Sequence, residues 1–165
     1  MHEKVLLFFL INSIEEYSKY LKELLLMPRL DTYHNTVKRA LEKNNWTITH
    51  DPFLLRIGRK KLYADLGAAY LVSAEKNHKK IMVEIKSFIG PSEVRDLEQA
   101  VGQYIVYQQV IEKKTQDYTV YLAVTTKTYE SIFTDELGQL LLNNQIIRLL
   151  VFDAEKEVIT QWIPD

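Results

Sequence analysis

Apolar residues recur along the chain with two kinds of spacing, and these spacings predict the order of helices and strands. The spacing typical of helices marks the segments 31–43, 93–113 and 127–143. Alternation and short apolar runs, which are typical of strands, mark 46–50, 53–57, 62–66, 70–76, 81–89, 118–124, 146–152 and 158–162. The order of helix, strand meander, helix, strand, helix and strand predicts one α/β domain with a mixed sheet flanked by helices.

Turn-forming residues set the predicted ends of several strands. Asp51-Pro52 is expected to break the chain between the first two extended segments. The polar pair Asn77-His78 predicts a tight turn that joins the strands on either side of it in antiparallel fashion. Gly90-Pro91 then ends the meander.

The first two predicted helices each have a capping residue and an apolar face. Asp31 or Thr32 caps the first helix, and Ser92 caps the second. The residues expected on the buried faces are Val37, Ala40 and Leu41 in the first helix, and Val94, Leu97, Val101, Tyr104 and Ile111 in the second.

Residues 1–29 are expected to form a helical extension outside the main domain, which spans residues 30–165. The apolar run from Val5 to Ile11 is too short to cross a bilayer, and no cleavage site of small residues follows it. A membrane anchor and a signal peptide are therefore not expected. An alternative is that Met27 is the natural start and that the residues before it are upstream sequence.

Composition narrows the class of protein. With 165 residues, of which 47% are hydrophobic and 26% charged, the chain can bury the core of one domain. It has no cysteine, which excludes disulfides and thiolate metal sites and fits a cytoplasmic location. The net charge of -1 argues against a protein that coats nucleic acid through a general basic surface. Contact with DNA is then expected to be local, metal-assisted or helped by a partner.

Candidate chemistry lies in the stretch VEIKSF, residues 83–88. Because side chains alternate along a strand, Glu84 and Lys86 are expected on one face, opposite to Val83 and Ile85. Asp65 is an isolated acid in the apolar strand 62–66. If these strands share a sheet, Asp65 and Glu84 approach each other, and a divalent cation between them would relieve their repulsion.

Carboxylate oxygens suit Mg²⁺ or Mn²⁺, with water and a substrate phosphate completing the coordination. Lys86 would orient the attacking water or stabilise the negative charge that develops on the phosphate. The set of Asp65, Glu84 and Lys86 therefore predicts a site that cleaves phosphodiesters. The competing interpretation is a solvated outer sheet face that carries the same charges without a function.

Asp65 followed by Glu84-Ile85-Lys86 resembles the Asp…(Asp/Glu)-x-Lys signature of the restriction-endonuclease-like, or PD-(D/E)XK, nuclease superfamily, and the predicted element order is similar to that core. More specific likeness is to the XisH family, the fdxN element excision controlling factors of cyanobacteria. It covers about residues 30–162. The stretches that carry it are HNTVKRALEKNNWTITHDPFLL, KKLYADLGA, VSAEK, VEIKSFIGPSEVRDLEQAVGQYIVYQ and YLAVTTKTYESIF.

The resemblance implies roles for individual residues. Asp65 and Glu84 would ligate one Mg²⁺ or Mn²⁺ ion, the carbonyl of Ile85 is a candidate third ligand, and Lys86 would be the catalytic lysine. Gln103 and Tyr107 lie four residues apart on the long helix and resemble a Gln-x-x-x-Tyr element of some nucleases, although simple packing on the sheet explains Tyr107 equally well.

The sequence departs from the superfamily at one position. Many members place a Glu on the first helix, and here His34 stands about there. An imidazole can ligate a metal or act as acid or base, and it can equally be a surface or capping residue.

The family likeness implies an accessory factor in the excision of a DNA element, which acts beside a site-specific recombinase and a second small, XisI-like controlling factor. Catalysis is an implication of the fold and not of the family description. Alternatives are a non-catalytic regulator that binds DNA or a partner, and the nuclease of a defence or toxin-antidote pair. The N-terminal helix and the Tyr-rich long helix offer an interface for a homo-oligomer.

Overall fold

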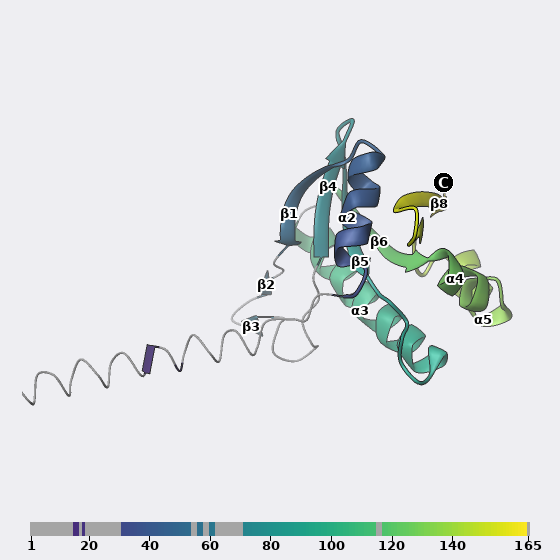
Figure 1. The fold of residues 1–165 in the computed structure, drawn as a ribbon. Helices are drawn as coiled ribbons and strands as arrows, with labels where there is room; N and C mark the ends of the chain where they lie inside the picture. Colours follow the sequence, from purple (N-terminus) through teal and green to yellow (C-terminus); the bar gives the residue numbers. More distant parts are fainter. Residues whose placement is uncertain are drawn as a thin grey trace, which may run out of the picture.

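The computed structural model describes residues 31–53, 71–114 and 117–164, together with 56–57, 60–61 and the isolated positions 15, 16 and 18. A six-stranded sheet forms the centre of the molecule (Figure 1). Its strands, in spatial order, are β1 (Thr47–Phe53), β4 (Leu71–Lys76), β5 (Lys79–Ile85), β6 (Tyr118–Thr125), β7 (Leu149–Asp153) and β8 (Val158–Ile163). A separate two-stranded ladder pairs β2 (Arg56–Ile57) with β3 (Lys60–Lys61).

The sheet is mixed, as the sequence predicts. Strands β1, β4 and β5 form an antiparallel meander. Strand β6 lies parallel to both β5 and β7, and β8 returns antiparallel to β7. The parallel pair β5 and β6 is joined through α3 (Glu93–Lys114), because parallel neighbours need a crossover connection. This arrangement of an α/β mixed sheet and flanking helices is consistent with a restriction-endonuclease-like core.

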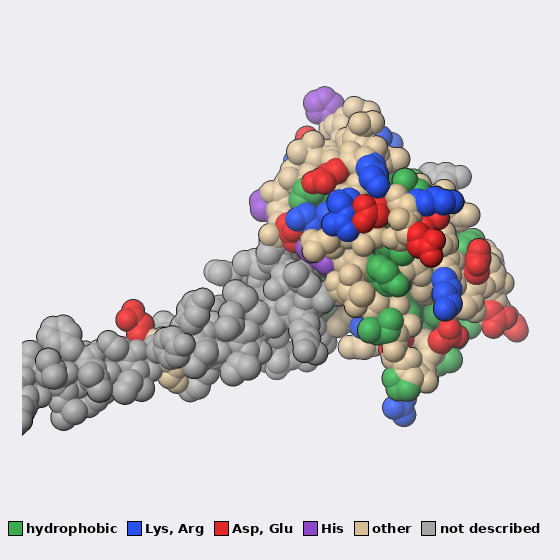
Figure 2. Space-filling model, in the orientation of Figure 1, with side chains coloured by type: hydrophobic (Ala, Val, Ile, Leu, Met, Phe, Trp, Pro, Cys, Tyr) green, Lys and Arg blue, Asp and Glu red, His purple; other side chains and the backbone are tan. Residues whose placement is uncertain are grey.

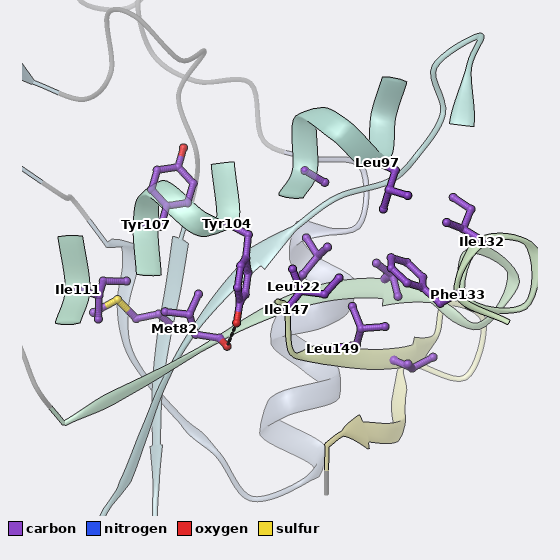
Figure 3. Close-up of a cluster of buried hydrophobic side chains, with 14 of the residues drawn as sticks. Met82, Leu97, Tyr104, Tyr107, Ile111, Leu122, Ile132, Phe133, Ile147 and Leu149 are labelled. Atoms are coloured by element: carbon purple, nitrogen blue, oxygen red, sulfur yellow. Dashed lines mark hydrogen bonds between the residues drawn. The ribbon is translucent and has the colours of Figure 1, made fainter. Parts of the chain in front are cut away.

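Helices cover the two faces of the sheet and create two apolar clusters. Helix α2 (His34–Lys43) buries Val37 and Leu41 against the face that carries Ile81, Val83 and Ile85. Helix α3 covers the opposite face, which carries Met82, Leu122 and Leu149. In this second cluster the hydroxyl of Tyr104 donates a 3.0 Å hydrogen bond to the carbonyl of Val120 (Figure 3). The alternation expected for β5 is therefore confirmed.

The hairpin between β4 and β5 has the predicted two-residue turn. Asn77 and His78 have φ values of 50° and 64°, so both lie in the left-handed region. A two-residue turn of this kind matches the right-handed twist of antiparallel strands. The turn places Leu71 of β4 opposite Glu84 of β5.

Strand β1 differs from the prediction because it does not end at Asp51-Pro52. It continues through both residues to Phe53, with shifts in register after Ile48 and after His50. Strand β1 lies at the edge of the sheet, where a proline costs no ladder hydrogen bond, and the irregular register absorbs it.

The predicted helix 127–143 is also wrong as a single element. The chain forms α4 (Thr126–Thr128), a π-helical turn (Tyr129–Phe133) and then α5 (Glu136–Asn143). Asp135 is extended and caps α5 by accepting a hydrogen bond from the N–H of Glu136. A Cβ on Gly138 would lie 2.2 Å from the carbonyl oxygen of Ile132, so only glycine allows α5 to pack so closely on the preceding turn.

Two smaller expectations fail at the ends of elements. Strand β5 ends at Ile85 and not at Ile89, because the chain turns away from the sheet and Phe88 adopts a φ of 51°. Val94 belongs to the first turn of α3 and is 53% exposed, whereas Leu97, one turn later, begins the buried face. Figure 1 shows that this end of α3 projects beyond the sheet.

Some predictions fall on residues that the structure does not describe. The strand 62–66, which contains Asp65, lies outside the described residues. So does the N-terminal extension, apart from Glu15, Glu16 and Ser18, which are helical and exposed. Among the described residues, no helix is long and apolar enough to cross a membrane.

Candidate functional site

Glu84 is a buried carboxyl near the end of β5. It lies on the face of the sheet that α3 covers, and it is only 4% exposed. Its Oε2 atom has no hydrogen-bond partner among the described residues. Burial raises the pKa of Glu84 to about 8; the ammonium of Lys86 opposes this rise, and the carboxylate of Asp31 adds to it. The fold therefore buries an acid of which one oxygen has no partner among the described residues.

Lys86 lies two residues farther along and is held between the sheet and α3. Its backbone N–H donates to the carbonyl of Ala123 on β6, and its Nζ donates a 3.3 Å hydrogen bond to Oε1 of Gln99 on α3. The side chain is only partly exposed, and its charge lowers the pKa of Glu84. Glu84 and Lys86 thus face the same helix.

A polar stripe on α3 faces this pair. It consists of Gln99, Gln103 and Tyr107, which follow one another at intervals of four residues and so share one side of the helix. Gln103 and Tyr107 are buried. Burial and the nearby carboxylate of Glu84 both raise the pKa of Tyr107. In Figure 3 the Tyr107 hydroxyl points away from the other labelled side chains of the apolar cluster. The ring of Tyr107 therefore packs on this cluster, and its oxygen lies outside the cluster.

Asp31 is not among the site residues that the sequence predicts, because the sequence pattern gives it only the role of a helix cap. Its Oδ1 accepts a hydrogen bond from the N–H of Tyr33, and its Oδ2 accepts one from the N–H of Ser87, at 2.9 and 2.8 Å. These bonds tie the start of α2 to the segment that follows Lys86. The available signal is the position of this acid just before the first predicted helix.

His34, which stands about where that acid was expected, contacts a different carboxylate. Its Nε2 atom lies 2.8 Å from Oδ1 of Asp51 on β1, and its side chain is buried. Lys38 also donates to Asp51. Burial acts to raise the pKa of Asp51, but the hydrogen bonds from Lys38 and His34 prevail and lower it. His34, Lys38 and Asp51 are therefore a structural ionic group that joins α2 to β1.

One atom at Glu84 is of the kind that a hard divalent cation prefers. A buried carboxylate oxygen without a partner is a suitable ligand for Mg²⁺ or Mn²⁺, and Ile85 follows at the end of β5 with its backbone carbonyl. No group of three His, Asp or Glu side chains in the described part of the chain is placed to hold a metal. Asp65, the other predicted ligand, lies outside that part, so the pairing of Asp65 with Glu84 stays a prediction.

Comparison with known proteins supports the family resemblance that the sequence shows. Two crystal structures share the fold: an XisH family protein from Nostoc punctiforme PCC 73102, 35% identical with a TM-score of 0.73, and an fdxN element excision controlling factor protein from Anabaena variabilis, 38% identical with a TM-score of 0.71. Each match covers 81% of this chain and 99% of the other. None of the curated proteins matches this chain. The family model described as XisH protein matches residues 27–160, and the chain therefore belongs to the XisH family.

Proposed function

We propose that this protein is an accessory controlling factor in the excision of a DNA element, and that it acts on DNA through a Mg²⁺- or Mn²⁺-dependent site that cleaves phosphodiesters. What carries the proposal is the buried carboxyl of Glu84, with an unpartnered oxygen and with Lys86 beside it. Such a group is costly for stability unless a cation joins it, so its burial is typical of functional sites.

In this proposal Glu84 and Asp65 hold one metal ion, with the carbonyl of Ile85 as a further ligand. The ion would supply charge neutralisation at the substrate phosphate. Lys86 stabilises the negative charge that develops on the phosphate or orients the attacking water. Gln99 holds the ammonium of Lys86 in place, and Gln103 lines the same side of α3.

The proposed partners follow from the family. They are DNA, a site-specific recombinase and a second small, XisI-like controlling factor. The location that goes with these partners in the proposal is the cytoplasm, beside the chromosome. The crystallised relative from Anabaena variabilis is described as an fdxN element excision controlling factor protein, which supports a role in excision for this chain.

Nicking of supercoiled plasmid tests the proposal. The wild-type protein is expected to nick DNA with Mg²⁺ or Mn²⁺ and not with a chelator. Lys86→Ala and Glu84→Gln are expected to lower the rate by at least about a hundredfold, as loss of a charged group at a reacting phosphate does. Asp51→Asn removes a carboxylate from the ionic group on α2 and β1, so it is the matched control and is expected to keep the activity.

The outcomes separate the proposal from the regulatory alternative. Intact plasmid under both metals, with protein that is folded and binds the metal, would leave a non-catalytic regulator on a nuclease-like fold. Equal nicking by wild type and Lys86→Ala would show that the activity comes from a contaminant or from another site.

A further inference from the structure

A concave pocket opens at the end of the sheet where β5 begins, on the face that carries α2. This pocket has a volume of about 660 Å³ and lies among the β4–β5 turn, the residues after α2 and the last strand, β8. In Figure 1 these elements lie at the end of the sheet away from the segment that joins β5 to α3. Lys79 and Glu84 are five residues apart on β5, or roughly 17 Å along the strand, and alternation places them on opposite faces of the sheet.

Aromatic side chains form one wall of this pocket. Trp46 and Trp162 have ring centroids 5.6 Å apart, and Tyr121 meets Trp162 edge to face at 4.8 Å. All three line the pocket and are partly exposed. The contacts of Trp46 with Trp162 also join the end of α2 to β8, so the wall is rigid. A pre-formed aromatic surface of this kind is suited to stacking with a planar ring.

Cations line the rim of the same pocket. The lining contains Lys79, Lys80 and Arg148, and of these Lys79 is exposed. Lys80 shares its face of β5 with Met82, and its Nζ lies 5.7 Å from the centroid of the Tyr118 ring on the α3 side of the sheet. The cations on the side of the aromatic wall are therefore Lys79 and Arg148. Among the described residues, no carboxylate forms an ion pair with any of the three. Asp117 is the one acid in the described lining, so positive charge prevails there.

We infer that this pocket binds a nucleotide, with the base against Trp46 and Trp162 and the phosphate toward Arg148 and Lys79. An aromatic wall beside cations that form no ion pair with the described residues is complementary to a planar ring that carries an anion, and the volume is within the range of small-ligand pockets. The nucleotide is either free or the unpaired end of a nucleic-acid strand. This inference does not depend on the proposed cleavage at Glu84.

Tryptophan fluorescence gives a direct test, because Trp46 and Trp162 are the only tryptophans in the chain and both line the pocket. The full-length protein is titrated with adenosine monophosphate, adenosine, inorganic phosphate and a short single-stranded oligodeoxyadenylate, without metal. Adenosine monophosphate is expected to quench the emission saturably. Adenosine and phosphate are each expected to bind at least about tenfold more weakly, since each lacks half of the recognised chemistry.

Charge variants make the test specific. Arg148→Ala and Lys79→Ala are expected to weaken binding of the monophosphate severalfold to about tenfold, and Asp117→Asn is expected to strengthen it. Lys127→Ala removes an exposed lysine of α4 outside the pocket and is the matched control. Tighter binding of the oligonucleotide than of the monophosphate would identify a strand end as the source; the reverse order would identify a free nucleotide.

Other results would overturn the inference. The first is that neither adenosine monophosphate nor the oligonucleotide changes the tryptophan emission. The second is that inorganic phosphate binds as tightly as the monophosphate. The third is that neither Arg148→Ala nor Asp117→Asn changes the affinity for the monophosphate. Absence of nucleotide binding would leave the cleavage proposal intact, because Glu84 and Lys86 do not line the pocket. Glu84→Gln keeps every residue of the pocket, so it is expected to bind the monophosphate as the wild type does even where it no longer nicks DNA.

Discussion

Two partly or fully buried acids show how differently this fold treats the same chemical group. The side chain of Asp51 is 19% exposed and is contacted by His34 and Lys38, and their hydrogen bonds outweigh burial and lower its pKa. Glu84 is 4% exposed, has an oxygen without a partner, and has a pKa raised to about 8 by burial. Figure 2 shows charges of both signs interspersed over α2, which is the neighbourhood of Asp51.

The difference separates a structural acid from a candidate functional one. Both carboxylate oxygens of Asp51 are contacted from α2, one by His34 and the other by Lys38, so this carboxylate needs no further partner. Within the part of the chain that the structure describes, Glu84 has no ion pair, and it is destabilising when it ionises, so the fold tolerates it at a cost. A divalent cation at Glu84 would reverse that cost, and this reversal is what the proposed function requires.

The largest expected effect is on the pH dependence of stability. Below pH 4.5, the ordinary pKa of a glutamate, Glu84 is protonated in the folded and in the unfolded protein. Between pH 4.5 and about 8 it ionises in the unfolded protein but stays protonated in the folded one. The metal-free protein therefore loses stability as the pH rises through this range. The shift corresponds to at most roughly 5 kcal/mol. Glu84→Gln is expected to remove this loss, as measured by urea unfolding from pH 4 to 9. Parallel pH curves for the two proteins would contradict the account.

The next effect is stabilisation by metal. Mn²⁺ at about a hundred times its dissociation constant is expected to stabilise the wild type by about 2.7 kcal/mol, because it binds only the folded state. Glu84→Gln is expected to lose this response and Asp51→Asn to keep it. Thermal unfolding with and without metal above pH 8 measures the difference. An equal gain in both variants would place the metal elsewhere.

Asp51→Asn is expected to act in the opposite direction with pH. The folded pKa of Asp51 is lowered, so its contribution to stability is present above the ordinary pKa of 3.8 and is lost as pH falls through the folded value. The variant is expected to be about 1 kcal/mol less stable at neutral pH, as for partly exposed ion pairs. Near pH 2 the difference is expected to vanish. A constant difference at all pH values would exclude an electrostatic origin.

The smallest effects come from the neighbours of Glu84. Lys86→Met removes a charge that lowers the pKa of Glu84, so the loss of stability is expected to extend to higher pH. Asp31→Asn removes a charge that raises it, so the loss is expected to end at lower pH. Each variant is compared with wild type by urea unfolding across the same pH range. If both variants move the pH at which the loss of stability ends in the same direction, the charges of Lys86 and Asp31 do not act on Glu84 as the geometry indicates.

The sequence predicts the sheet well because its strands are long apolar runs with clear turns. The positive φ values of Asn77 and His78 and the alternation along β5 are local properties, and local patterns report them. The passage of β1 through Asp51-Pro52 depends on its edge position, and the split of the last long helix depends on contact between Gly138 and Ile132. Neither is visible to a local pattern.

The site is predicted only where its members share a strand or helix. Glu84 and Lys86 lie two residues apart, and Gln103 and Tyr107 lie four apart, so periodicity alone places each pair on one face. Asp31 meets Ser87 across 56 positions of the chain, and His34 meets Asp51 through the packing of α2 on β1. Such contacts are set by tertiary structure, which explains why Asp31 was missed and why His34 was considered as a substitute ligand.

The most direct test of the central claim is calorimetry of Mn²⁺ binding in buffers with different ionisation enthalpies. With a pKa of about 8, Glu84 is mostly protonated at pH 7, so a metal that ligates it displaces that proton. We expect one site, release of close to one proton per ion at pH 7 and almost none above pH 9, and loss of the site in Glu84→Gln. Binding without proton release at pH 7, or unchanged binding to Glu84→Gln, would contradict the claim that this acid holds a cation.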